Sequence, residues 1–201
     1  MNDPVRPRRP LYLGPQDLEA RGGLVDPVRE IEAAHESAAV LVRSGRAGDD
    51  PQLTHRLVGI VDELGLATVA RLWAERPARS LPGALWRLYA LREWVHLDPA
   101  LASREYAAGV KFAGVEHVVA GAAEPPGPDQ LIALVDAVLH GVFDGDLAVA
   151  LQRAASFCRV VSAGRAEVGE GERSALGAAA LLATATDLDA AAGLWRRGDL
   201  V

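Results

Sequence analysis

The chain has 201 residues, of which 50% are hydrophobic and 24% charged, a composition typical of a soluble protein with enough apolar material for a core. The net charge of −6 argues against a general nucleic-acid-binding protein, and the single cysteine excludes both an intrachain disulfide and a cysteine metal cluster. The longest apolar run, Gly177–Ala185, is far too short to span a membrane, and no apolar stretch follows the basic N-terminus. We therefore expect a cytoplasmic protein without a membrane partner.

Residues 1–26 are rich in proline, glycine and arginine, and we expect them to form an extended N-terminal arm. One interpretation is a tail with little apolar material to bury, so that residues 1–10 are dispensable for folding. The other is an arm whose Leu11, Tyr12 and Leu13 dock onto the body or onto a second subunit. The composition of the segment leaves both interpretations open.

Helix start signals recur through residues 27–201, which we expect to fold as a single helical domain. Asp26-Pro27 and Asp98-Pro99, for example, each place a capping carboxylate before a proline at the first helical position. No segment shows the alternating pattern of a strand. The sequence therefore predicts an all-α fold, a compact bundle of about seven to nine helices. The predicted helices are 27–44, 51–64, 66–75, 82–97, 99–122, 128–141, 145–163, 172–184 and 187–197.

Residues 82–97, PGALWRLYALREWVHL, form the most apolar of the predicted helices. Leu88 and Leu91 lie on one side of this helix and Trp86 lies roughly opposite, so apolar side chains point from most of its faces. A helix of this kind is typically central, with neighbours on several sides. We therefore place it at the centre of the bundle and expect Trp86 and Trp94 to be largely buried.

One sector of this central helix carries polar groups. Arg92 and His96 project there beside Tyr89, and these three residues are candidates for binding a small ligand between helices. A buried arginine needs a carboxylate close by, because an isolated buried charge is strongly destabilising. We expect Glu105 to supply that carboxylate, since the chain turns back at Asp98-Pro99.

The pattern Glu-x-x-His occurs twice, in two different predicted helices. A spacing of three residues places both side chains on one helix face, where they can share a metal ion. Two such pairs, with one carboxylate from each of two other helices, resemble the di-iron or di-manganese site of ferritin-like bundles. The metal ligands that this resemblance implies are Glu32, His35, Glu93 and His96, with Glu105 and Glu116 as the single carboxylates. The order and length of the predicted helices depart from that family, and the alternative is a histidine satisfied by its own helix.

The C-terminal part follows a glycine-rich joint, Gly164–Arg173. Thr186 with Asp189 three residues on resembles a capping box and predicts the start of a separate last helix. We therefore expect a C-terminal helical hairpin over residues 172–201. Cys158, in the helix before the joint, falls on an apolar stripe and is predicted to be a small buried hydrophobic residue.

The chain has no phosphate-binding loop, dinucleotide-binding glycine motif, nucleophile elbow or calcium-binding loop. We therefore expect a non-enzymatic helical module that interacts with or regulates a protein partner, either as a monomer or as a homodimer, without a cofactor. The alternatives are a carboxylate-bridged metal protein and a small-ligand-binding bundle. Elemental analysis of protein purified without chelator separates the first of these alternatives from the interaction module.

Overall fold

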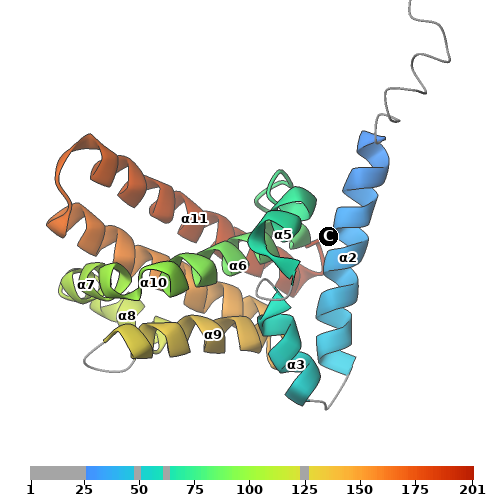
Figure 1. Ribbon diagram of the computed structural model, residues 1–201, viewed down its shortest axis with the longest axis horizontal. Coiled ribbons are helices and arrows are strands. Elements are labelled where there is room, and N and C mark those ends of the chain that lie inside the picture. The colour runs from blue at the N-terminus through green and yellow to red at the C-terminus, as the bar shows by residue number, and fades with distance from the viewer. Residues whose placement is uncertain (1–25, 48–50, 61–63, 123–126) are drawn as a thin grey trace, which may run out of the picture.

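The computed structural model describes residues 26–47, 51–60, 64–122 and 127–201, and within these ranges the chain is helical with no strand (Figure 1). The all-α bundle predicted from the sequence is therefore confirmed. The predicted arm lies, apart from Asp26, outside the described residues. The described helices are α2 (Pro27–Ala47), α3 (Pro51–Val58), α5 (Leu66–Trp73), α6 (Leu81–Leu97), α7 (Pro99–Val110), α8 (Gly114–Ala120), α9 (Pro128–Asp144), α10 (Leu147–Val168) and α11 (Gly171–Arg197).

Several helices begin where side chains satisfy the first backbone N–H groups. Asp26 accepts a hydrogen bond from the N–H of Val28 at 3.0 Å, and Asp98 accepts one from the N–H of Leu101 at 2.9 Å. Asp146 caps α10 in the same way, through the N–H of Ala148 at 2.8 Å. These caps are local features of the chain, and for this reason the sequence located the starts of α2 and α7 correctly.

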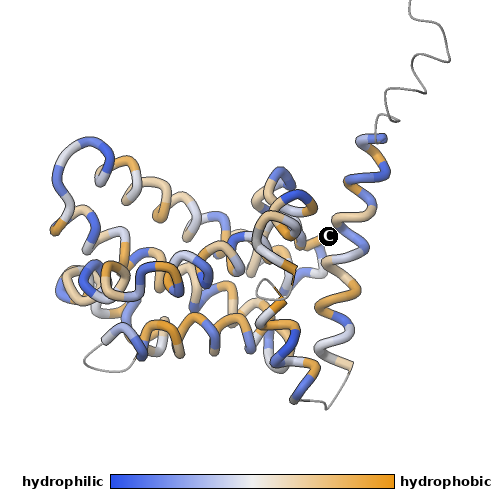
Figure 2. Tube along the Cα trace, viewed as in Figure 1, coloured by the Kyte–Doolittle hydropathy of each residue, from blue (hydrophilic) through white to orange (hydrophobic). Residues whose placement is uncertain are grey.

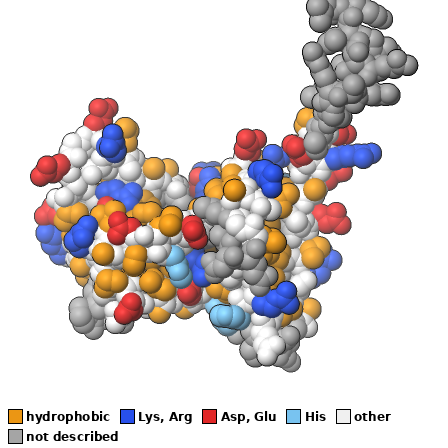
Figure 3. All heavy atoms as spheres, viewed as in Figure 1, with side chains coloured by type: hydrophobic (Ala, Val, Ile, Leu, Met, Phe, Trp, Pro, Cys, Tyr) orange, Lys and Arg blue, Asp and Glu red, His pale blue; other side chains and the backbone are white. Residues whose placement is uncertain are grey.

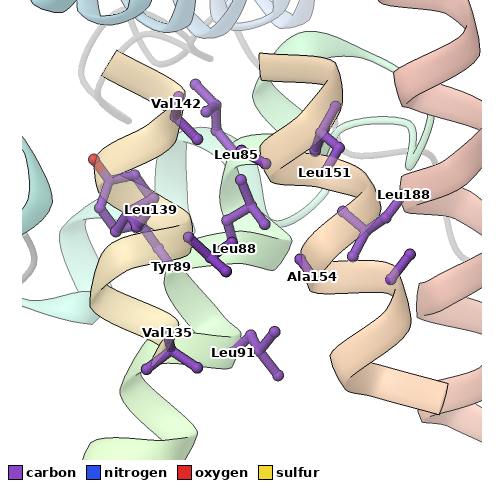
Figure 4. Close-up of a cluster of buried hydrophobic side chains, with 14 of the residues drawn as sticks. Leu85, Leu88, Tyr89, Leu91, Val135, Leu139, Val142, Leu151, Ala154 and Leu188 are labelled. Carbon is purple, nitrogen blue, oxygen red and sulfur yellow. The ribbon is translucent and has the colours of Figure 1, made fainter. Parts of the chain in front are cut away.

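Helix α6 is central, as predicted, because it contacts α2, α5, α7, α9, α10 and α11. Figure 4 shows Leu88 and Leu91 of α6 pointing toward side chains of α9 and α10. On α9 the apolar residues recur turn by turn among polar ones, which gives the alternating colours of that helix in Figure 2. The inward residues of α9, among them Val135 and Leu139, are buried against α6.

Helix α10 forms a second axis of the bundle and packs against α7, α8, α9 and α11. Its crossing with α7 is unusually close because both helices present a glycine. A Cβ atom on Gly164 would lie 1.6 Å from the carbonyl oxygen of Glu105, and one on Gly109 would lie 1.9 Å from that of Val160. The two backbones therefore touch, and no side chain fits between them.

Two predicted helix boundaries in the second half of the chain are wrong. The predicted helix 99–122 is interrupted, since α7 ends at Val110 and α8 begins at Gly114. The interruption lets α8 turn onto α10, where the carboxylate of Glu116 accepts a hydrogen bond from the hydroxyl of Ser156 at 2.5 Å.

The predicted C-terminal hairpin is also wrong, because one helix, α11, runs without a break through Thr186. The hydroxyl of Thr186 donates to the carbonyl of Leu182 in the preceding turn, so it does not cap a new helix. Asp189, the expected partner in the capping box, forms an ion pair with Arg159 of α10. The antiparallel pair at this end of the molecule is α10 with α11 (Figure 1).

The prediction that Trp86 and Trp94 are largely buried is met only in part, because both pack against the core but keep part of their surface exposed. The tryptophan that fills the core is Trp73 of α5, which is 2% exposed. Its indole N–H donates to the hydroxyl of Ser37 on α2 at 3.0 Å. The two tryptophans of α6 lie instead at a groove beside α11, which is described below.

Candidate functional site

Of the three predicted ligand-binding residues, Tyr89 is part of the core. Its side chain is fully buried, and its hydroxyl donates to the carbonyl of Leu57 at 2.6 Å. Burial raises the pKa of this hydroxyl well above its ordinary value, and the nearby positive charge of Arg92 opposes the shift only in part. The tyrosine therefore joins α6 to α3 and does not line the cavity next to Arg92.

The other two predicted residues, Arg92 and His96, meet at one carboxylate oxygen of α9. Arg92 Nε donates to Asp136 Oδ1 at 2.7 Å, and His96 Nε2 lies 3.0 Å from the same oxygen. The arginine side chain is 8% exposed and that of the aspartate 35%. The predicted need of Arg92 for a carboxylate is met, but the partner is Asp136 and not Glu105.

A cavity of about 340 Å³ lies beside this cluster. Arg92 and Asp136 form one wall, and His55 of α3 and His140 of α9 form the rest of its polar lining. His96 is not among the residues that line it. The structure thus brings Arg92 and His96 together and places only Arg92 at a cavity.

The two Glu-x-x-His pairs lie at opposite ends of α6. His35 lines a cavity with Leu81, the first residue of α6, whereas His96 is the residue before its last. At a rise of 1.5 Å per residue these ends are about 22 Å apart, too far for one metal centre. Glu32 is exposed on α2 and Glu93 is half-buried. Among the described residues no group of three histidine, cysteine, aspartate or glutamate side chains could hold a metal ion.

The carboxylates assigned to complete that metal site have other partners. Glu105 accepts two hydrogen bonds from Arg165 of α10, at 2.9 and 2.8 Å. Glu116 binds the hydroxyl of Ser156 and lies 3.6 Å from a guanidinium nitrogen of Arg159. Both glutamates therefore hold α7 and α8 against α10, and the ferritin-like arrangement is not formed by the described residues.

The structure reveals a site that the sequence analysis did not identify, a groove between α6 and α11 with a volume of about 400 Å³. We call it the tryptophan groove, because Trp86 and Trp94 form its α6 wall with Ala90 between them. Its α11 wall consists of small and apolar side chains, including Ala180 and Leu181. The groove is therefore a largely apolar cleft in which both tryptophans keep part of their rings exposed.

Arginines hold fixed positions at the rim of the tryptophan groove. The guanidinium of Arg165 lies 5.1 Å from the ring centroid of Trp94 and is anchored from behind by Glu105. Arg87 donates to the carbonyl of Gly83 at 2.9 Å and lies 3.8 Å from Asp187. Because both arginines are held by their own chain, the groove presents a preformed surface.

The groove continues into a wider hollow of about 870 Å³ at the first turns of α11. Arg165 and Gly177 line both spaces, so the two form one channel along α11. The sequence did contain a signal for the α6 wall, since Trp86, Ala90 and Trp94 follow one another at intervals of four residues. The sequence predicts burial of both tryptophans and no groove, because it does not show which helix lies opposite them.

Helix α11 also differs from the other described helices in its length and apolar composition. Among the described helices it alone is long and apolar enough to cross a membrane by length and composition, and 28% of its most apolar 18-residue window is buried. The rest of that apolar window is partly or fully exposed.

We compared the chain with models of protein families, with curated proteins and with solved structures, and none of the three comparisons gave a match. The function has therefore to be inferred from the geometry of the residues themselves.

Proposed function

We propose that the protein is a non-enzymatic interaction module whose tryptophan groove binds an amphipathic helix of a protein partner. The observation that carries this proposal is the half-burial of Trp86 and Trp94 side by side in an apolar groove rimmed by arginine. Tryptophan and arginine are the residue types most enriched where the binding energy of interfaces is concentrated. Covering the exposed part of both rings removes apolar surface from water and favours binding.

The shape of the groove supports a helical ligand. Its two walls are themselves helices, an arrangement that typically accepts a third helix carrying apolar residues at intervals of three and four. From Thr184 to Glu172 the channel follows twelve residues of α11, about 18 Å at the rise of an α-helix. That length accommodates roughly three turns of a partner helix.

The charges of the molecule are compatible with a protein partner. On the face drawn in Figure 3, lysine and arginine side chains are interspersed with aspartate and glutamate, so the described surface in view has no broad field of one sign. Apolar side chains lie between these charges over much of the same face. A non-obligate protein–protein interface has about the same apolar share as the rest of a protein surface, so this mixture is compatible with a protein partner.

Site-specific photo-cross-linking tests the proposal. A benzophenone amino acid at Ala180, inside the groove, should cross-link one protein in the cells that naturally express this chain. The same group at Val149, an exposed residue of α10, should not cross-link that protein. Equal products at both positions, or none at Ala180 above background, would contradict a binding site in the groove.

The purified partner then allows a quantitative test. Trp94→Ala should weaken its binding by about thirtyfold or more, which corresponds to the 2 kcal/mol or more typical of a central interface tryptophan. Leu182→Ala is the matched control, because Leu182 of α11 is 51% exposed and lines neither the groove nor the hollow that continues it. An equal loss of binding in both variants would place the partner outside the groove.

A further inference from the structure

The outward face of α11 carries a regular repeat that the packing of the monomer does not use. Steps of alternately four and three residues along α11 lead from Glu172 to Arg197 along one side of the helix. The residues of this series are Glu172, Leu176, Ala179, Ala183, Thr186, Ala190, Gly193 and Arg197. None of the residues in this series is buried, and Leu176 is 64% exposed. Residues at alternating spacings of four and three lie along one side of a helix, the side through which helices of a coiled coil pack against one another. We call this series the outer seam of α11.

We propose that the outer seam binds the same seam of a second copy of this chain in antiparallel orientation, forming a two-fold symmetric dimer. The orientation follows from the charges at the two ends of the seam. Glu172 stands at its beginning and Arg197 at its end, so an antiparallel pair places each glutamate opposite an arginine, whose guanidinium also pairs with the exposed Asp199 of its own chain at 3.2 Å. A parallel pair would place like charges opposite each other.

The order of side chains along the outer seam supports the same register. When Glu172 of one copy lies level with Arg197 of the other, Ala183 lies level with Thr186 and Ala179 with Ala190. These residues are small and let the two helix axes approach closely. Because the series is self-complementary about its midpoint, the contact closes on two copies and does not extend into a filament.

Gly193 provides an independent argument. In the same register it lies level with Leu176 of the other copy, the largest apolar side chain of the seam. A glycine inside a helix lowers the stability of that helix by about 1 kcal/mol relative to alanine. Within its own chain a Cβ atom at this position would meet only the flexible Arg197 side chain, at 3.5 Å. The monomer therefore does not need glycine here, whereas the dimer needs it as the space that receives Leu176.

The proposed dimer and the tryptophan groove use different residues of α11. Gly177, Ala180 and Leu181 line the groove, and none of them belongs to the outer seam. The two surfaces meet only at the start of α11, where Glu172 and Leu176 of the seam also line the wider hollow. Neither proposal depends on the other. Cross-linking from Ala180 tests the groove, and the oligomeric state tests the seam.

Light scattering after size-exclusion chromatography tests the dimer with the full chain. The wild type should have twice the 21.2 kDa mass of one chain and dissociate on dilution. Gly193→Leu should raise the dimer dissociation constant by about a hundredfold, because overpacking occurs twice in a symmetric contact. Gly114→Leu is the matched control, since a Cβ atom there meets nothing within 4 Å, and it should leave the dissociation constant unchanged.

Exchanging the large and the small side chain tests directly whether Leu176 packs against Gly193 of the other copy. Combining Gly193→Leu with Leu176→Ala should restore most of the dimer, because the large side chain and the space exchange places. A monomeric wild type, or a dimer unaffected by Gly193→Leu, would overturn the proposal. So would binding of monomers through α11 to vesicles of phosphatidylcholine and phosphatidylglycerol, which would make the outer seam a membrane-contacting surface. Circular dichroism of each variant confirms that the monomer remains folded.

Discussion

Glu105 of α7 and Arg165 of α10 form a two-bond ion pair at the point where the two helices touch. Arg165 Nε and Nη2 donate to the two carboxylate oxygens at 2.9 and 2.8 Å. The glutamate side chain is 7% exposed and that of the arginine 18%, so the pair lies largely away from water. On its other side the same guanidinium rests on the ring of Trp94. The helix crossing and the tryptophan groove are therefore coupled through one arginine.

The Glu105–Arg165 pair should respond asymmetrically to substitution. We expect Glu105→Gln to lower the free energy of unfolding by about 2–3 kcal/mol, because it leaves the arginine charge without a counterion. Arg165→Met should lower it less, since the remaining carboxyl can take up a proton. Urea unfolding of both variants and of the double variant measures the difference. Equal losses in the two single variants, with no recovery in the double variant, would contradict this account.

The glycine contact between α7 and α10 gives a second prediction. Gly164→Ala should lower the free energy of unfolding by about 3 kcal/mol or more, because the added methyl group overlaps the backbone of Glu105 and forces the helices apart. Gly114→Ala has open space around it and should be close to neutral. Chemical denaturation followed by circular dichroism compares the two. A mild effect of Gly164→Ala would show that the crossing is wider than described.

Three of the four tryptophans should separate into one that supports the fold, Trp73, and two that serve the groove, Trp86 and Trp94. Trp73→Ala should cost about 3–5 kcal/mol of stability, the range for a large aromatic side chain in a core. Trp86→Ala should cost only about 1–2 kcal/mol, because part of the side chain is already exposed to water before the change. Thermal unfolding of the two variants tests this ranking. The reverse order would mean that the groove is closed in solution.

Alkaline pH should destabilise the protein in part through Cys158. Burial raises the pKa of this thiol to about 12 from an ordinary value of 9.0, against the opposing influence of the nearby Arg159. Well below pH 9.0 the thiol keeps its proton in both the folded and the unfolded chain, so the free energy of unfolding is not reduced by ionisation of Cys158. Above it the unfolded chain ionises first, and the free energy of unfolding falls until the folded thiol also ionises. Burial of Tyr106 raises the pKa of its hydroxyl and adds to the same decline at higher pH.

Urea unfolding across this alkaline range checks the contribution of the thiol. A Cys158→Val variant should show a shallower decline of stability with pH than the wild type, because one of the contributing groups is gone. An unchanged slope would mean that the thiol ionises equally in both states. In the folded wild type the thiol should also react with Ellman's reagent only as fast as the chain unfolds, since it is fully buried.

The sequence was sufficient for features that depend on neighbouring residues. Asp26-Pro27 and Asp98-Pro99 start helices because a capping carboxylate and a proline act within one turn. The spacing of apolar residues likewise identified an all-helical chain and a helix, 82–97, with neighbours on several sides. It also showed that Arg92 needs a carboxylate, since that follows from burying a charge in any fold.

Features that depend on distant residues came only from the tertiary structure. Helical periodicity tells which side chains share a face but not which helix lies opposite that face. Arg92 therefore meets Asp136, 44 residues away, while the expected Glu105 meets Arg165, 60 residues away. The same limit explains why the two Glu-x-x-His pairs, each well formed on its own helix, lie at opposite ends of α6.

For the tryptophan groove and the outer seam of α11, too, the sequence contains the residues and only the tertiary structure shows the surface that they form. Their side chains and spacings are present in the sequence, where aromatic and apolar stripes most often indicate core. Only the position of α11 beside α6 leaves Trp86 and Trp94 half-covered, and only the unbroken course of α11 through Thr186 aligns Glu172 with Arg197 on one face. Local chemistry thus determined the helices, and the packing of their faces determined which apolar surfaces stayed open, because burial depends on every neighbour at once.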